Sequence, residues 1–292
     1  MGKPGKLFCF GLGFSALHLA RRLQREGWAV AGTCRSEEKR QALLAEGIIA
    51  HLFDRQQAVN DAAAALRDAT HIMSSIPPDD FGDPVLDLHL RELQNLESLR
   101  WIGYLSTTGV YGDRGGDWVD ENSPRKPTLD RSRRRALAED GWLTLWERDG
   151  LPVHVFRLAG IYGPGRSAID TVRGGAAKRI VKPGQVFSRI HVDDIATVLI
   201  ASMARPNPGA AYNVCDDNPA PPDEVIAYAA ELLRVEPPPV EPFEKADLSE
   251  MARSFYADNK RVRNNRIKEE LGVRLKYPDY RAGLQAILAG SS

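Results

Sequence analysis

Cysteine is rare in this sequence, and no pattern suggests a metal site. The three cysteines, Cys9, Cys34 and Cys215, are widely spaced, odd in number, and form neither a CxxC pair nor a Cys/His cluster. This spacing argues against a disulfide framework and against bound zinc. Cys9 and Cys34 stand inside apolar stretches, which predicts buried free thiols and a reducing, cytoplasmic location.

Net charge, long apolar runs and a targeting segment are also lacking. Lysine plus arginine and aspartate plus glutamate each number 39, so the formal net charge is zero, whereas proteins held to nucleic acid or anionic membranes by charge carry a basic surplus. No stretch approaches the roughly 18 apolar residues of a membrane span, and the N-terminal MGKPGK has no apolar signal-peptide core. The basic run from Arg131 to Arg135 lacks interleaved aromatic residues. These features favour a small-molecule partner, with no nucleic acid and no membrane.

The first 110 residues alternate apolar runs with amphipathic stretches. The apolar runs predict buried strands, and the amphipathic stretches, two of which end at a glycine, predict helices. We expect strands at 7–10, 28–34, 48–53, 71–76 and 101–105, with helices opening near residues 16 and 36 and at 58–66 and 86–99. A helix at 130–148 and a strand at 153–158 follow. This alternation predicts an α/β fold with a doubly wound parallel sheet.

Beyond residue 158 the rhythm becomes irregular, with turns rich in glycine and proline and a proline-rich run at 236–242. We therefore expect a nucleotide-binding domain of residues 1–158 plus about 190–204. Residues 159–189 and 205–292 should form a smaller, mixed C-terminal domain that covers the substrate.

A glycine-rich turn follows the first predicted strand. Gly11-Leu12-Gly13-Phe14-Ser15-Ala16 is a GxGxxA pattern at the start of an amphipathic helix. Gly11 permits a tight turn, Gly13 lets the backbone approach a pyrophosphate, and Ala16 allows close packing of helix on strand. The start of the helix adds N–H groups and a positive dipole. Because the pattern lies in the first βαβ unit, it predicts a Rossmann-type dinucleotide site rather than a purely structural turn.

The end of the second predicted strand indicates which dinucleotide is preferred. An NAD site has an acidic residue there to bind the ribose hydroxyls. This chain instead has Thr33-Cys34-Arg35-Ser36, with Lys39 one turn further on. An arginine fork suits a 2′-phosphate, so we expect NADP, with NAD less favoured. In the alternative interpretation, Arg35 and Lys39 only solvate the start of a helix, beside Glu37 and Glu38.

Four motifs in this order resemble those of an extended short-chain dehydrogenase/reductase of the NAD-dependent epimerase/dehydratase group. They are the glycine loop; Leu105–Gly112 followed by Glu121; Arg157–Gly165; and Arg189–Ala196, which leads to Tyr212-Asn-Val. The resemblance implies that Asp54 lies near the adenine of the cofactor, Ser74, Ser75 and Ile76 along its middle, and Ile161 at its nicotinamide end. It also implies a homodimer formed through two helices that flank the sheet.

One element of that family is missing. Its members use a Ser or Thr after the fifth strand, then a Tyr-x-x-x-Lys pair on the next helix. The Ser/Thr position corresponds to Thr107, but the Tyr and Lys positions fall on Arg131 and Arg135, and no tyrosine lies between Tyr111 and Tyr162. A guanidinium does not deprotonate in proteins, so Arg131 cannot serve as a general base. Arg135 could still hold the nicotinamide ribose or an acidic substrate.

Substitute proton carriers are Tyr111, Tyr162, Glu121 and His191. Tyr111 and Tyr162 stand in tyrosine–glycine turns, where packing explains them as well as catalysis does. His191 precedes Asp193 and Asp194, a pattern more typical of a strand-to-helix junction with an aspartate N-cap than of a catalytic dyad.

Two functions fit these observations. The first is an NADPH-dependent oxidoreductase that acts on a small polar carbonyl or sugar-like substrate with a displaced proton donor. The second is an NADP-binding sensor or scaffold without turnover. A further alternative is an NAD-dependent sugar-nucleotide epimerase or dehydratase. The absent tyrosine and lysine favour the second, while Thr107 and the intact loop motifs fit either.

Overall fold

The computed structural model describes residues 4–290. The chain divides into two compact units, which we describe separately. The first is made of Met1–Thr107, Asp130–Arg157 and Ala196–Tyr212, and the second of Thr108–Leu129, Leu158–Ile195 and Asn213–Ser292. This division differs from the one expected from the sequence chiefly in placing residues 108–129 in the second unit.

A seven-stranded parallel sheet forms the centre of the first unit, in the order β11-β7-β5-β4-β1-β2-β3. The strands are β1 (Lys6–Phe10), β2 (Ala29–Cys34), β3 (Ile49–Leu52), β4 (His71–Ser74), β5 (Trp101–Thr107), β7 (Val153–Leu158) and β11 (Ala211–Val214). From β1 the chain steps outward to β2 and β3, then returns to β4 on the other side of β1. This reversal confirms the doubly wound topology and places a switch point between β1 and β4.

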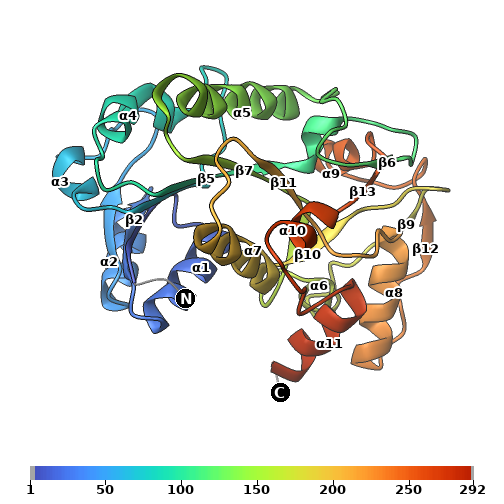
Figure 1. The fold of residues 1–292 in the computed structure, drawn as a ribbon. Coiled ribbons are helices and arrows are strands. Elements are labelled where there is room, and N and C mark those ends of the chain that lie inside the picture. Colours follow the sequence, from blue (N-terminus) through green and yellow to red (C-terminus); the bar gives the residue numbers. More distant parts are fainter. Residues whose placement is uncertain (1–3, 291–292) are drawn as a thin grey trace. The chain divides into compact units, whose positions relative to one another are not determined.

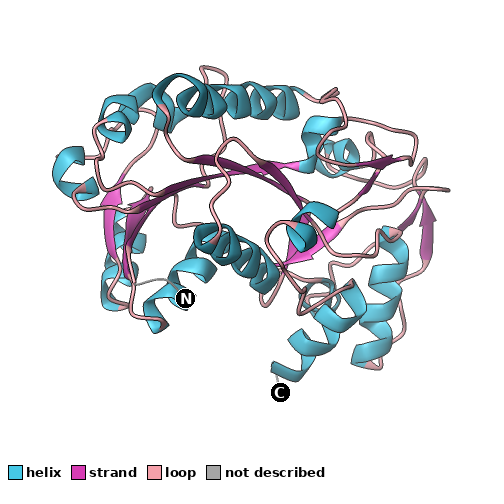
Figure 2. Ribbon diagram, viewed as in Figure 1, coloured by secondary structure: helices cyan, strands magenta, loops and turns pink. Residues whose placement is uncertain are grey.

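Helices cover both faces of this sheet (Figure 2). They are α1 (Phe14–Arg25), α2 (Glu37–Ala45), α3 (Ala62–Leu66), α4 (Pro84–Gln94), α5 (Asp130–Asp149) and α7 (Val192–Ala204). Figure 1 shows α1 and α2 on one face and α3, α4 and α5 on the other. Apolar side chains fill the space between the sheet and the second of these layers, among them Phe10, Tyr104 and Trp142.

Two helices are displaced from their predicted bounds because of capping residues. The helix expected at 58–66 begins at Ala62, since Asp61 adopts a left-handed conformation (φ 46°) and its carboxylate accepts from the Ala64 N–H. The helix expected at 86–99 runs from Pro84 to Gln94. Its cap is Asp83, which accepts from the N–H groups of Val85 and Leu86 at 2.9 and 3.3 Å. Both caps satisfy N–H groups that a helix start leaves unpaired.

The second unit combines helices with short strands. Its helices are η1 (Thr108–Tyr111), α6 (Ala168–Arg173), α8 (Pro222–Leu233), α9 (Glu250–Phe255), α10 (Asn265–Glu269) and α11 (Tyr280–Gly290). Short parallel strand pairs join β8 (Gly160–Tyr162) to β10 (Arg189–His191), β9 (Arg179–Val181) to β12 (Val240–Pro242), and β6 (Trp118–Val119) to β13 (Arg261–Val262).

Over the described part of the chain, no helix has both the length and the apolar character to cross a bilayer. Within residues 4–290, no group of three or more His, Cys, Asp or Glu side chains is arranged to hold a metal ion. All three cysteines are buried free thiols.

A buried histidine in the sheet predicts an acid-dependent contribution to stability. His154 accepts from the Asn207 N–H through Nε2 (2.9 Å) and donates through Nδ1 to the Ile102 carbonyl (3.2 Å), and burial lowers its pKa to about 4. Its neutral form therefore stabilises the fold above the unfolded pKa of roughly 6.5, and this contribution is lost as pH falls toward the folded value. The cost of His154→Gln, measured by urea unfolding, should shrink by about 2–3 kcal/mol between pH 7 and pH 4. An equal cost at both pH values would contradict this account.

Candidate functional site

The glycine loop between β1 and α1 is fastened to the end of β2. Gly11 has a φ of +86°, its N–H donates to the Thr33 hydroxyl (2.8 Å), and the next N–H, of Leu12, donates to the Thr33 carbonyl (2.8 Å). Thr33 is only 1% exposed. Thr33 therefore holds the loop through both of these N–H groups.

The loop leaves room at Gly13 and none at Gly11. A Cβ placed on Gly13 would meet nothing within 4 Å, whereas one on Gly11 would lie 2.9 Å from both Ile76 and Ser75. Gly13 is also the N-cap of α1, and no side chain caps that helix. Phe14 and Ser15 open α1, and Ala16 is fully buried against the sheet. Backbone N–H groups beside open space fit a pyrophosphate at the N-terminus of α1.

The basic residues after β2 lie at the surface. Arg35 and Lys39 are exposed, and neither side chain forms a hydrogen bond or ion pair with residues 4–290. Ser36 caps α2, because its hydroxyl accepts from the Lys39 N–H (3.3 Å). The guanidinium of Arg40, by contrast, is paired with Glu37 (2.7 Å). The cations at Arg35 and Lys39 thus remain available for an anionic ligand group.

The segment after β4 lies against the glycine loop. The hydroxyl of Ser75 donates to the Gly11 carbonyl (2.6 Å), and the Ser75 N–H donates to the Phe10 carbonyl (3.0 Å). Ser74 is fully buried, and its hydroxyl has no partner among the described residues. The segment therefore flanks the glycine loop, and the placing of Ser74, Ser75 and Ile76 along a cofactor stays a prediction.

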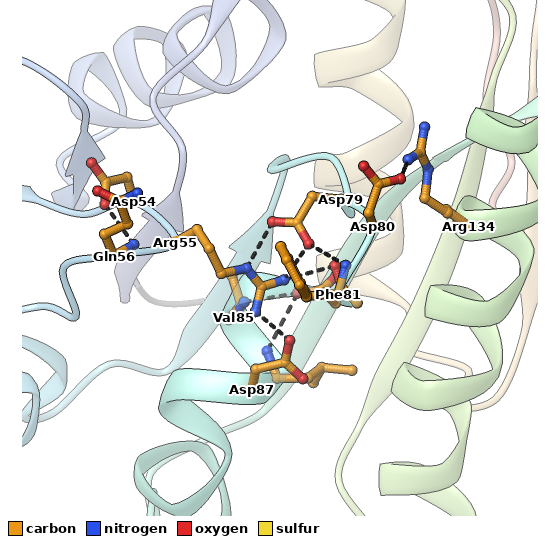
Figure 3. Close-up of polar contacts among 12 residues, drawn as sticks. Asp54, Arg55, Gln56, Asp79, Asp80, Phe81, Val85, Asp87 and Arg134 are labelled. Carbon is orange, nitrogen blue, oxygen red and sulfur yellow. Dashed lines mark hydrogen bonds and ion pairs between the residues drawn. The ribbon is translucent and has the colours of Figure 1, made fainter.

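Asp54, after β3, is exposed and folds back on its own turn (Figure 3). One of its carboxylate oxygens accepts from the N–H groups of Gln56 (2.8 Å) and Gln57 (2.9 Å).

Arg135, which the resemblance predicts at the Lys position of the family, forms hydrogen bonds within the protein. Its Nη1 donates to the carbonyls of Leu105 (2.9 Å) and Ile76 (3.5 Å) and to the hydroxyl of Tyr104 (3.1 Å). Tyr104 is fully buried, and burial raises its pKa well above the usual range, so its hydroxyl stays protonated. Arg135 therefore joins the carboxyl ends of β4 and β5. Thr107 ends β5 and Arg131 lies in the first turn of α5, and both are partly buried.

The substitute proton carriers of the second unit are held in structural roles. Tyr111 is fully buried, and its hydroxyl donates to the side-chain oxygen of Asn213 (2.8 Å). The backbone N–H of Asn213 in turn donates to the Glu121 carboxylate (2.8 Å). Burial raises the pKa of Glu121. Tyr162 donates to the Asp279 carbonyl (3.3 Å), and burial raises its pKa as well.

Ile161 and His191 lie on the paired short strands β8 and β10 of the second unit. Ile161 lies in β8, opposite Ile190 of β10. The expected aspartate cap after His191 is wrong. His191 itself accepts from the Asp193 N–H (3.1 Å), while the Asp194 carboxylate binds the N–H groups of Lys276 and Tyr277.

The sequence did not indicate the buried polar network beside Arg135. Glu139, one turn further along α5, is fully buried and accepts from the Ser106 hydroxyl (2.5 Å) and from Arg157 (2.8 Å). Arg157 is 5% exposed. The helical spacing of Arg131, Arg135 and Glu139, on one face of α5, was the signal that could have revealed it.

The family model for the NAD-dependent epimerase/dehydratase family matches residues 11–215. The chain therefore belongs to this family of extended short-chain dehydrogenase/reductases, which bind nicotinamide dinucleotides. Protein YeeZ of Escherichia coli K12 is 30% identical over 285 residues, which cover 94% of this chain and 97% of that protein.

Solved structures show the same fold. A conserved protein of unknown function from Silicibacter pomeroyi is 54% identical, with a TM-score of 0.90 over 98% of this chain and 99% of that one. The dTDP-glucose 4,6-dehydratase of Bacillus anthracis, solved in complex with NAD, is 19% identical, with a TM-score of 0.75 over 98% of this chain and 96% of that one. At 19% identity, the similarity to the dehydratase supports a shared fold only.

Proposed function

We propose that the chain binds NADP(H) and reduces a small polar carbonyl or sugar-like compound. The observation that carries the proposal is the pairing of an open, uncapped glycine loop with two unpaired cations at the end of β2. The N–H groups of residues 11–13 are already bonded within the protein, so the uncapped first turn of α1 is what offers N–H groups to a pyrophosphate. Arg35 with Lys39 offers charge to a 2′-phosphate. Ser75 and Ile76 would border the bound dinucleotide.

The cofactor would supply a hydride to the carbonyl carbon, and the chain's own residues would orient the substrate. Thr107 ends β5 and can donate a hydrogen bond to the carbonyl oxygen. The proton that this oxygen gains would come from a displaced donor, because Arg131 cannot release one. A buried, protonated Tyr104 does not exchange protons with a ligand at neutral pH. The buried free thiols support our placing the protein in the cytoplasm.

An absorbance screen for NADPH oxidation across carbonyl and keto-sugar substrates tests the reductase proposal. Oxidation of NADPH that depends on both the protein and one substrate class would support it. Tight NADPH binding without turnover across the screen would reject the reductase and leave a binding protein. That second candidate is favoured by one observation, that Arg135 is bonded to the strand ends rather than directed to a ligand.

Replacement of Arg131 should have little effect on cofactor binding. Because Arg131 lies in the first turn of α5, outside the glycine loop and the segment after β2, Arg131→Ala should leave the NADPH dissociation constant within about three-fold of the unmodified chain, or less than about 0.7 kcal/mol. A guanidinium cannot cycle a proton at neutral pH, so any turnover should lack the alkaline pH dependence that a tyrosine base produces. Calorimetric titration and a pH–rate profile measure the two effects. A turnover that rises with the ionisation of a group near pH 10 would contradict this prediction.

A further inference from the structure

The turn after β4 is locked in place by an arginine from the loop after β3. The guanidinium of Arg55 donates to both carboxylate oxygens of Asp79 (2.7 and 2.8 Å). It also donates to the Gly82 carbonyl (2.9 Å) and to the Asp87 carboxylate (2.5 Å). Figure 3 shows Arg55 between the carboxylates of Asp79 and Asp87. Such bidentate pairs fix geometry as well as supplying energy.

Other contacts hold the same turn from inside and from α5. The Asp79 N–H donates to the Gly82 carbonyl (2.9 Å), and the Phe81 N–H donates to the Asp79 carboxylate (2.9 Å). Asp80 is paired with Arg134 of α5. Asp83, which is 5% exposed, accepts from the indole N–H of Trp142 (2.9 Å). Pro77 and Pro78 stiffen the approach to the turn.

Phe81 stands at the tip of this locked turn with 85% of its surface exposed. A single exposed apolar residue on a mobile loop needs no explanation. Here, however, the Arg55–Asp79 and Asp80–Arg134 pairs and the hydrogen bonds of the turn restrain the backbone that carries the ring. An aromatic side chain presented on a rigid backbone is suited to bind a planar ligand with little loss of conformational entropy.

The topology of the sheet places this turn beside the cofactor loop. In the sheet, β3 and β4 are separated by β2 and β1, yet Arg55 after β3 reaches Asp79 after β4. The loops after β3 and β4, which lead into α3 and α4, therefore meet beyond the carboxyl ends of β1 and β2. The glycine loop and Arg35 follow those same two strands. A dinucleotide fixed at both has its adenosine on the β2–β3 side, where Arg55 is anchored.

We propose that Phe81 stacks on the adenine of the bound dinucleotide and that Arg55 is the residue that positions it. This inference rests on the proposed NADP(H) binding. It assigns the adenine rather than the nicotinamide because the bidentate partner of Asp79, Arg55, comes from the loop after β3, the strand next to β2. Bases stack on aromatic side chains regardless of sequence, since every base has a π-face.

Calorimetric titration of Phe81→Ala tests the contact. Both NADPH and NADH should bind about five- to fifty-fold more weakly, because the adenine is common to both and base stacking is worth about that much. Leu137→Ala is the matched control, since Leu137 is a 70% exposed apolar residue on α5, and it should not change either affinity. If the unmodified chain binds NADPH and Phe81→Ala binds it equally well, the inference is overturned and the proposed function stands. If the unmodified chain binds no dinucleotide, both fall.

A tryptophan in place of Phe81 distinguishes the two ends of the cofactor. The fluorescence of Phe81→Trp, after subtraction of the unmodified chain, should be quenched by adenosine 2′,5′-bisphosphate and not by nicotinamide mononucleotide. Leu137→Trp should respond to neither. Adding Arg55→Gln should lower the quenching at saturating ligand while the protein remains folded, a change that a merely stabilising role for Arg55 would not cause. Quenching by the mononucleotide alone, or undiminished quenching in the Arg55→Gln background, would overturn the assignment.

Discussion

Calorimetric titration should give NADPH a dissociation constant about ten-fold or more below that of NADH. The pyrophosphate binds to backbone N–H groups that serve both dinucleotides alike, so only the 2′ position separates them. There the chain offers Arg35, exposed and without a partner among the described residues, and no carboxylate in the position that binds a free ribose. A hydrogen bond to a charged group contributes about 1.5–3 kcal/mol, which corresponds to roughly ten- to hundred-fold in affinity.

Arg35→Ala should remove most of that difference and leave NADH affinity nearly unchanged. Lys39→Ala should weaken NADPH by a smaller factor, because an ammonium acts as a point charge and not as a planar fork. Arg40→Ala is the control, since the Arg40 guanidinium is already paired with Glu37. Equal affinities for the two dinucleotides in the unmodified chain would mean that Arg35 only solvates the start of α2.

Glu139→Ala should lower the free energy of unfolding by about 3–5 kcal/mol, the usual cost of leaving one member of a buried ion pair alone. Arg157 is 5% exposed and loses its carboxylate partner, and the Ser106 hydroxyl loses its acceptor. Urea unfolding monitored by tryptophan fluorescence measures the change. Glu147→Ala, an exposed position on the same helix, should change stability by less than about 0.5 kcal/mol.

A variant that removes both charges separates the two causes of that loss. Glu139→Met with Arg157→Met leaves no unpaired buried ion, so it should recover part of the stability lost by Glu139→Ala. A single-variant loss below about 1 kcal/mol would contradict the account, because it would mean that Arg157 finds water or another partner.

The sheet and the glycine loop were predictable from the sequence because local patterns determine them. Buried parallel strands show as continuous apolar runs, as at Phe8 and Ile72, and the turn at Gly11 requires a positive φ that glycine readily adopts. Helix starts were predicted less well. Asp61 and Asp83 act as caps only in their observed backbone conformations, which the apolar periodicity does not encode.

The partners of the charged residues could not be predicted from the sequence. The sequence predicts that Arg135 stands at the lysine position of the family, but its bonds to Ile76 and Leu105 join residues distant in the chain. The same holds for Arg55 with Asp79 and for Glu139 with Arg157. The sequence shows that a cationic side chain needs an anion, a carbonyl or water as a partner, but only the folded structure determines which of these lies nearby.

The bonds of Arg135 bear on whether a Tyr-x-x-x-Lys pair could be introduced at positions 131 and 135. A lysine ends nearer to its backbone than the Arg135 Nη1 atom that makes these bonds, so Arg135→Lys would leave the carbonyls of Ile76 and Leu105 short of a donor. Such a loss costs on the order of 1–3 kcal/mol for a buried group. The lysine substitution therefore lowers stability whether or not a tyrosine stands at position 131, and introducing the pair calls for another donor at the carboxyl ends of β4 and β5.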